Sequence, residues 1–94
     1  MSSVKLVRLP EKFDFSYHKK FNEEMDTALK NPEVSNIDLD FSTVSYLDSA
    51  ALGMIVYLHK KASAVNKSIA IINASGTAAE ILKVANIERI VTVK

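Results

Sequence analysis

One hydroxyl group in this sequence stands where it could accept a phosphoryl group. Ser49 follows Asp48 at the point where an apolar run ending at Leu47 gives way to a helical pattern. Asp is a preferred N-cap residue, so Asp48 can cap the helix and leave the Ser49 hydroxyl in its first turn. A helix N-terminus has unpaired N–H groups and a partial positive charge, and both favour a bound phosphate. The sequence therefore predicts a serine at which a phosphate would be stabilised.

Two carboxylates near this serine, those of Asp40 and Asp48, could also do chemistry. A close carboxylate pair can bind Mg²⁺ or act as an acid and a base, but no recognisable motif places a histidine, lysine or third acid beside them. We interpret Asp40 as a solvated acid at a strand end and Asp48 as a helix cap. His18 and His59 lack ligand spacing, and Ser49 lacks the glycine-framed turn of a hydrolase nucleophile. We therefore expect no enzyme, no metal site and no cofactor.

Composition points to one small domain covering residues 1–94. Of its 94 residues 48% are hydrophobic, and twelve basic residues nearly balance eleven acidic ones for a net charge of +1. This balance argues against nucleic-acid binding through a broad basic surface. The absence of cysteine excludes disulfides and cysteine-based zinc sites. No apolar run approaches the roughly 18–20 residues of a membrane span, and we see no signal-peptide pattern, so we expect a cytoplasmic domain without membrane contact.

The spacing of apolar residues predicts strands and helices that alternate along the chain. Strands are expected at residues 4–9, 37–41, 68–72 and 90–93, with a brief one near Phe13 and an apolar lead at 44–47. Helices are expected from about residue 17 to 30, from 49 to 65, and from 77 to about 86. Thr77 and Glu80 have the spacing of a capping box for the last helix. Alternation implies crossover connections and therefore a mixed, mostly parallel sheet.

The helix that starts at Ser49 has two different faces. At 100° per residue, one face carries the expected core positions Leu52, Ile55, His59 and Ala62, with Ala51 and Leu58 close by. The other face carries Ser49, Gly53, Val56, Tyr57 and Lys60. A glycine inside a helix costs about 1 kcal/mol relative to alanine, so Gly53 suggests that another backbone approaches it, either within the fold or from a partner. We interpret the outward face as a partner-binding surface; the alternative is that the domain covers both faces itself.

The run Asp48-Ser49-Ala50-Ala51-Leu52-Gly53, preceded by the strand at 37–41 and the lead at 44–47, resembles the signature of STAS domains. The closest group is that of bacterial anti-sigma factor antagonists, and the element order fits over nearly the whole chain. The resemblance implies an α/β fold, a STAS-like single domain in which helices pack mainly on one face of a mixed, mostly parallel sheet.

The resemblance also implies a role for the serine. In this family the serine directly after the acid is phosphorylated by a partner serine kinase, and Ser49 holds that position, with Asp48 before it. The implied mechanism is partner switching: the unphosphorylated domain binds an anti-sigma factor that is a serine protein kinase, phosphorylation at Ser49 releases it, and a PP2C-type phosphatase acts on the phosphorylated form. The partner-binding residues expected on this basis are Asp40, Asp48, Ser49, Gly53, Val56, Tyr57 and Lys60.

Other roles of the same fold stay open, namely an accessory subunit of a lipid-transport ATPase, a stressosome-like signalling scaffold, or a small nucleotide-binding protein. The sequence departs from the family at Ala51, where glycine is common. It also ends at Lys94, soon after its last strand, where many members carry a further helix. We therefore expect a monomer or a weak dimer, in which association would cover the surface that this helix protects.

Overall fold

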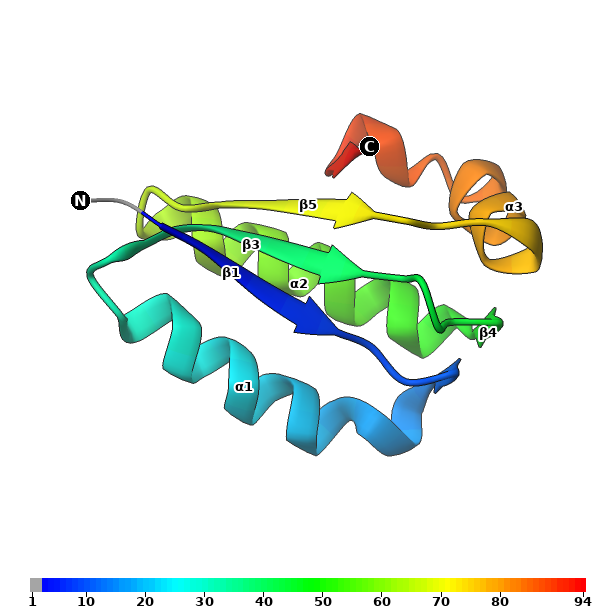
Figure 1. Cartoon of the computed structure of the whole chain (residues 1–94), viewed down its shortest axis with the longest axis horizontal. Helices are drawn as coiled ribbons and strands as arrows, with labels where there is room; N and C mark the ends of the chain where they lie inside the picture. Colours follow the sequence, from blue (N-terminus) through cyan, green and yellow to red (C-terminus); the bar gives the residue numbers. More distant parts are fainter. Residues whose placement is uncertain (1–2) are drawn as a thin grey trace.

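The computed structural model describes residues 3–94, which form two parallel sheets flanked by helices (Figure 1). Strands alternate with helices as the sequence predicts. In chain order the elements are β1 (Ser3–Arg8), β2 (Lys12–Phe13), the 3₁₀ turn η1 (Phe15–Tyr17), α1 (His18–Lys30), β3 (Val34–Asp40), β4 (Tyr46–Leu47), α2 (Ser49–Ala64), β5 (Ser68–Ile72), α3 (Gly76–Val84), the 3₁₀ turn η2 (Ile87–Arg89) and β6 (Thr92–Val93).

The larger sheet has the strand order β1-β3-β5-β6, and all its strand pairs are parallel. Parallel neighbours require crossovers, which α1 and α2 supply between β1 and β3 and between β3 and β5. In Figure 1 these two helices run along the same side of the sheet, while α3 lies beyond the end of β5. The predicted fold, a mostly parallel sheet with helices mainly on one face, is confirmed.

The core lies between this sheet and the two long helices. Along β3 and β5 the side chains that face the helices are apolar, and the parallel register places Ile37 beside Ile69 and Leu39 beside Ile71. From α2 the buried side chains are those of Ala51, Ile55, Leu58 and Ala62. Fully burying a branched or aromatic side chain stabilises a fold by about 1.5–3 kcal/mol, so these positions hold α2 firmly against the sheet.

A second, two-stranded sheet brings the segment before α1 next to the segment before α2. Its strands β2 and β4 pair Lys12 with Tyr46 and Phe13 with Leu47. Phe13 is fully buried, and its ring contacts the rings of Phe21 and Phe41 at centroid distances of 5.4 and 6.2 Å. The brief strand expected near Phe13 is therefore present, and it fixes β4 and the start of α2 against the core.

The C-terminal third corrects two expectations. The last α-helix begins at Gly76 after Ser75, and neither Thr77 nor Ser75 caps it with its side chain, so the capping box is wrong. Gly76 takes φ +57°, a conformation that glycine adopts without strain, and this turn starts the helix one residue early. The last strand is shorter than the expected 90–93, because the N–H groups of Ile90 and Val91 bond back to the Ile87 carbonyl of η2 and only Thr92 and Val93 pair with β5.

Candidate functional site

Ser49 is exposed at the first position of α2, and Asp48 caps this helix as predicted. Asp48 is extended (φ −103°, ψ −179°), and its Oδ1 accepts a hydrogen bond from the Ala51 N–H at 2.8 Å. The strand pair β2–β4 holds the residue before Asp48 in place, because Leu47 is paired with Phe13. A rigid support thus presents the Ser49 hydroxyl to solvent at the positive end of a 16-residue helix.

The second oxygen of Asp48 reaches a different segment. Oδ2 accepts a hydrogen bond of 3.4 Å from the backbone N–H of Phe15 in η1. Both carboxylate oxygens therefore accept from backbone N–H groups, so Asp48 serves as a structural acceptor and not as a base for Ser49. The arrangement suits a serine that is modified by the catalytic groups of another protein.

Phe15 and His18 form an aromatic stack beside this junction that the sequence interpretation missed. The Phe15 ring is 61% exposed, and it lies nearly parallel to the His18 ring at a centroid distance of 4.4 Å. His18 Nδ1 also lies 2.9 Å from the Phe15 carbonyl oxygen. The signal in the sequence was an aromatic residue just before the helix expected from about residue 17. Its position beside Asp48, 33 residues away, follows only from the pairing of β2 with β4.

Asp40 is not the solvated acid that the sequence suggested. It is only 4% exposed, and its carboxylate accepts hydrogen bonds from the Ser42 N–H at 2.9 Å and from the Asn73 amide at 3.1 Å. Arg8 Nε lies 3.7 Å from its other oxygen. The Ser42 N–H, the Asn73 amide and the Arg8 guanidinium together outweigh desolvation and lower the pKa of Asp40 below its usual value.

The Asp40 network joins the carboxyl ends of three strands. Arg8 ends β1, Asp40 ends β3, and Asn73 directly follows β5 in the left-handed conformation (φ 61°). Because it is buried, Asp40 offers a partner little surface, which corrects its expected role as a direct contact. It fixes the loop that leads from β3 to the Ser49 region.

The outward face of α2 is largely as predicted. Gly53, Tyr57 and Lys60 are exposed with Ser49, and the Tyr57 ring is 58% exposed. Lys61 Nζ lies 5.4 Å from the centre of that ring, and Lys61 also pairs with Asp26 of α1. Lys61 thus lies over one face of the Tyr57 ring, which is otherwise largely exposed.

Three positions of α2 differ from the predicted helical wheel. Val56 is half-buried and packs against the core, one turn after Leu52, so it belongs to the flank of the helix and not to its outer face. Leu52 and His59, expected in the core, are also only half-buried. The buried stripe is centred on Ala51, Ile55, Leu58 and Ala62, which rotates the helix slightly from the expected orientation.

Gly53 has free space around it. A Cβ built at this position would meet no atom of the neighbouring described residues within 4 Å. Close approach of another backbone within residues 3–94 is therefore excluded as the reason for a glycine here. Of the two explanations that the sequence left open, the approach of another backbone within the fold is wrong, and a partner that packs low over the helix stays a prediction.

An apolar groove lies between α2 and α3, beginning one turn after Ser49. It has a volume of about 340 Å³ and is lined by Leu52, Thr77, Glu80, Ile81, Val84 and Ala85. Val84 is 82% exposed at its rim. The sequence interpretation missed this groove because it placed Leu52 in the core.

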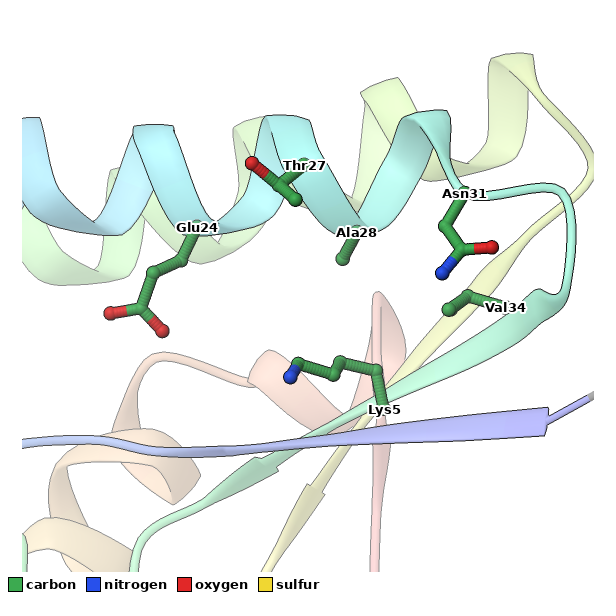
Figure 2. Close-up of a pocket in the computed structure, with 6 residues that line it drawn as sticks. All are labelled: Lys5, Glu24, Thr27, Ala28, Asn31 and Val34. Carbon is green, nitrogen blue, oxygen red and sulfur yellow. The ribbon is translucent and has the colours of Figure 1, made fainter.

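A separate pocket of about 250 Å³ lies between β1 and α1 (Figure 2). Lys5 from β1 and Glu24 from α1 point into it, and Thr27, Ala28, Asn31 and Val34 complete its lining. None of the predicted site residues lines this pocket. Across residues 3–94 we find no group of three or more acidic or histidine side chains placed to hold a metal ion, and no helix long and apolar enough to cross a membrane.

Comparison with known proteins identifies a family model, described as STAS domain, that matches residues 2–94. A STAS-domain containing protein of Pseudomonas aeruginosa (strain UCBPP-PA14) is 32% identical over 84 residues, which cover 89% of this chain and 81% of that protein. A solved structure of a candidate anti-sigma factor antagonist from Thermotoga maritima is 26% identical, with a TM-score of 0.78; the match covers 94% of this chain and 77% of the other.

Two further structures share the fold at lower identity. The anti-sigma factor antagonist SpoIIAA of Bacillus, in its unphosphorylated form, matches 100% of this chain and 81% of its own with a TM-score of 0.74 and 18% identity. A sulfate transporter family protein from Wolinella succinogenes matches 95% of this chain and 73% of its own with a TM-score of 0.77 and 11% identity. At these identities the likeness concerns the fold alone.

Proposed function

This chain belongs to the STAS domain family, and we propose that it is an anti-sigma factor antagonist that acts by partner switching. The observation that carries the proposal is the exposed Ser49 at the N-terminus of α2, whose cap is supplied by Asp48. A serine that is not needed as the cap and faces solvent suits a phosphorylation site. The Thermotoga maritima neighbour, described as a candidate antagonist of this kind, supports the same role.

In the proposed cycle the unphosphorylated chain binds an anti-sigma factor that is also a serine protein kinase. The contact surface, which we call the switch surface, consists of Ser49, Gly53, Tyr57 and Lys60, with Asp48 and Val56 at its edges and Asp40 fixing the loop beneath it. Gly53 lets the partner approach the helix closely, and Tyr57 offers an aromatic contact of a kind enriched at protein interfaces.

Phosphorylation of Ser49 would disrupt this contact. A phosphoserine carries a charge of about −1.5 to −2 at neutral pH, and here the added charge stands next to the Asp48 carboxylate. The helix N-terminus stabilises the phosphate within the chain, so the fold survives while the docking surface changes its charge. A PP2C-type phosphatase would then restore the binding form.

The proposed role also has consequences for the location and the oligomeric state of the chain. We propose a single STAS domain over residues 1–94 that works in the cytoplasm, without catalytic activity, cofactor, metal or nucleic acid, as a monomer or a weak dimer. SpoIIAA, which shares the fold, is described in both phosphorylated and unphosphorylated forms, and this supports a switch based on phosphorylation.

Affinity capture from the native cell tests the proposal, using wild type, Ser49→Ala and Ser49→Asp. We expect wild type and Ser49→Ala to retain a serine kinase of the anti-sigma type and Ser49→Asp to lose it, while Ser63→Asp, which adds the same charge to an exposed position at the other end of α2, retains it. Phosphopeptide mapping of the cellular protein should find the phosphate on Ser49. Capture of transport-ATPase subunits, or of a large multi-protein assembly, by all four variants would favour the accessory-subunit or scaffold role instead.

A further inference from the structure

Asp48 joins two segments that are far apart in the sequence. One carboxylate oxygen caps α2 through the Ala51 N–H at 2.8 Å, and the other accepts from the Phe15 N–H at 3.4 Å. The first distance is that of a good hydrogen bond, and the second is longer than the usual range for N–H···O. The same side chain therefore makes a strong contact to its own helix and a weak one to η1.

The weak contact helps to hold an exposed aromatic group. The Phe15 ring is 61% exposed and stacks on His18. The Phe15 carbonyl oxygen accepts from the His18 backbone N–H and lies 2.9 Å from His18 Nδ1, so only the N–H side of Phe15 depends on Asp48. Asp14 accepts from the Ser16 N–H at 3.0 Å, and Tyr17 donates to Glu24 at 3.2 Å. If the bond to Asp48 is lost, the Phe15 N–H is freed and the Phe15–His18 pair can shift relative to α2, while the Phe15 carbonyl stays bonded to His18.

We propose that Asp48 transmits the phosphorylation state of Ser49 to the Phe15–His18 stack. The proposal rests on the proposed function only in taking Ser49 as the phosphorylated residue. It adds the Phe15–His18 stack to the switch surface. The position of the stack would depend on whether Ser49 is phosphorylated, although Phe15 is 33 residues away from Asp48 in the sequence.

The physical reason lies in competition at the start of α2. A phosphate on the residue directly after Asp48 repels its carboxylate and offers a second acceptor to the unpaired N–H groups of the first turn. The carboxylate must then shift or share its donors, and the longer, exposed bond to Phe15 yields before the shorter bond to Ala51. A hydrogen bond of ordinary net strength changes such an equilibrium by about fivefold, so phosphorylation should raise the share of molecules with an unbonded Phe15 N–H by up to about that factor.

NMR spectroscopy of the isolated chain tests this without any partner. The measured quantities are the amide proton shift and exchange rate of Phe15, the ring proton shifts of His18, which report the stacked Phe15 ring, and the exchange rate of the Ala51 amide. The variants are Ser49→Asp and a protein carrying phosphoserine at position 49. Ser49→Asn is the neutral control, and Thr77→Asp adds a charge to the first turn of α3.

We expect phosphoserine, and to a smaller extent Ser49→Asp, to speed exchange of the Phe15 amide by about fivefold and to move the His18 ring shifts toward those of an unstacked histidine. Ala51 should stay protected, and both controls should resemble wild type. The inference is wrong if phosphoserine leaves Phe15 and His18 unchanged, or if Thr77→Asp changes them equally. Because no partner is present, this failure would leave the proposed function standing, whereas a cellular protein without phosphate on Ser49 would remove the function and not the coupling.

Discussion

The Asn73 amide donates a hydrogen bond of 3.1 Å to the buried carboxylate of Asp40, and this contact joins the end of β3 to the end of β5. Asn73 can make it because it takes the left-handed conformation (φ 61°), which asparagine tolerates better than most residues. The loop from β3 toward Ser49 leaves the sheet at this point, and the Ser42 N–H bonds the same carboxylate. The geometry of the loop that leads to Ser49 thus depends on an acid that lies beneath the surface.

Replacing Asp40 with alanine should destabilise the fold. The substitution removes the charged acceptor of the Ser42 N–H and the Asn73 amide, and a hydrogen bond to a charged group contributes about 1.5–3 kcal/mol. Urea unfolding followed by circular dichroism measures the loss. Glu80→Gln, at an exposed position, is the control and should stay within about 0.5 kcal/mol of wild type. A free energy of unfolding equal to that of wild type for Asp40→Ala would contradict the structural role.

Asp40 should also make the stability depend on pH in the acid range. Its folded-state pKa is lowered, first by the Ser42 N–H and then by Asn73, so the folded state binds this proton less readily than the unfolded state does. The resulting stabilisation is present above the unfolded pKa of about 3.9 and disappears as the pH falls through the lower folded-state value.

Asp40→Asn separates the pH dependence that comes from Asp40 from that of the other acidic residues. The variant should be less stable than wild type at neutral pH, and the difference should narrow below about pH 4 because the wild-type carboxylate becomes protonated. Urea titrations across this range measure the difference, with Asp38→Asn as a control that removes an acid from the same strand. A difference that does not change with pH would count against Asp40 as its source.

Asp48 should matter for the stability of the fold, whereas Ser49 should matter for partner binding. Asp48→Ala removes the cap of α2 and should cost about 1 kcal/mol, whereas Ser49→Ala should change stability little because Asp48 supplies the cap. Thermal unfolding measures both. We expect Ser49→Asp to keep the circular dichroism spectrum of wild type while it loses the kinase partner. A Ser49→Ala variant as unstable as Asp48→Ala would mean that the serine is structural.

Substitutions at Gly53 should distinguish the stability of α2 from partner binding by its outward face. Gly53→Ala should stabilise the chain by up to about 1 kcal/mol, because it improves helix propensity and its Cβ meets no neighbour within 4 Å. Gly53→Leu should also fold but should weaken partner binding, since the larger side chain occupies the space over the helix. Thermal unfolding combined with a binding titration checks both. Undiminished binding by Gly53→Leu would show that no partner packs there.

The sequence by itself determined the order of the elements and the place of Ser49, the proposed switch residue, at the start of a helix. The spacing of apolar residues predicted the three strands that carry the core, the brief strand at Phe13 and the long helices. It could do so because burying one face of a helix or strand makes apolar residues recur at a fixed interval in the sequence. The start of α2 was equally clear, since Asp48 and Ser49 act within a single helical turn. Most of the outward face of α2 followed from the same local geometry.

Tertiary structure alone decided which distant groups meet near Ser49. Asp40 is buried because Asn73 and Arg8 come from neighbouring strands, and Phe15 lies beside Asp48 because β2 pairs with β4. The groove beside Leu52 exists because α3 lies against that flank of α2. Each of these depends on strand register and on how helices pack, and these are set by the summed burial of many residues far apart in the chain. The local sequence pattern therefore does not predict strand register or helix packing.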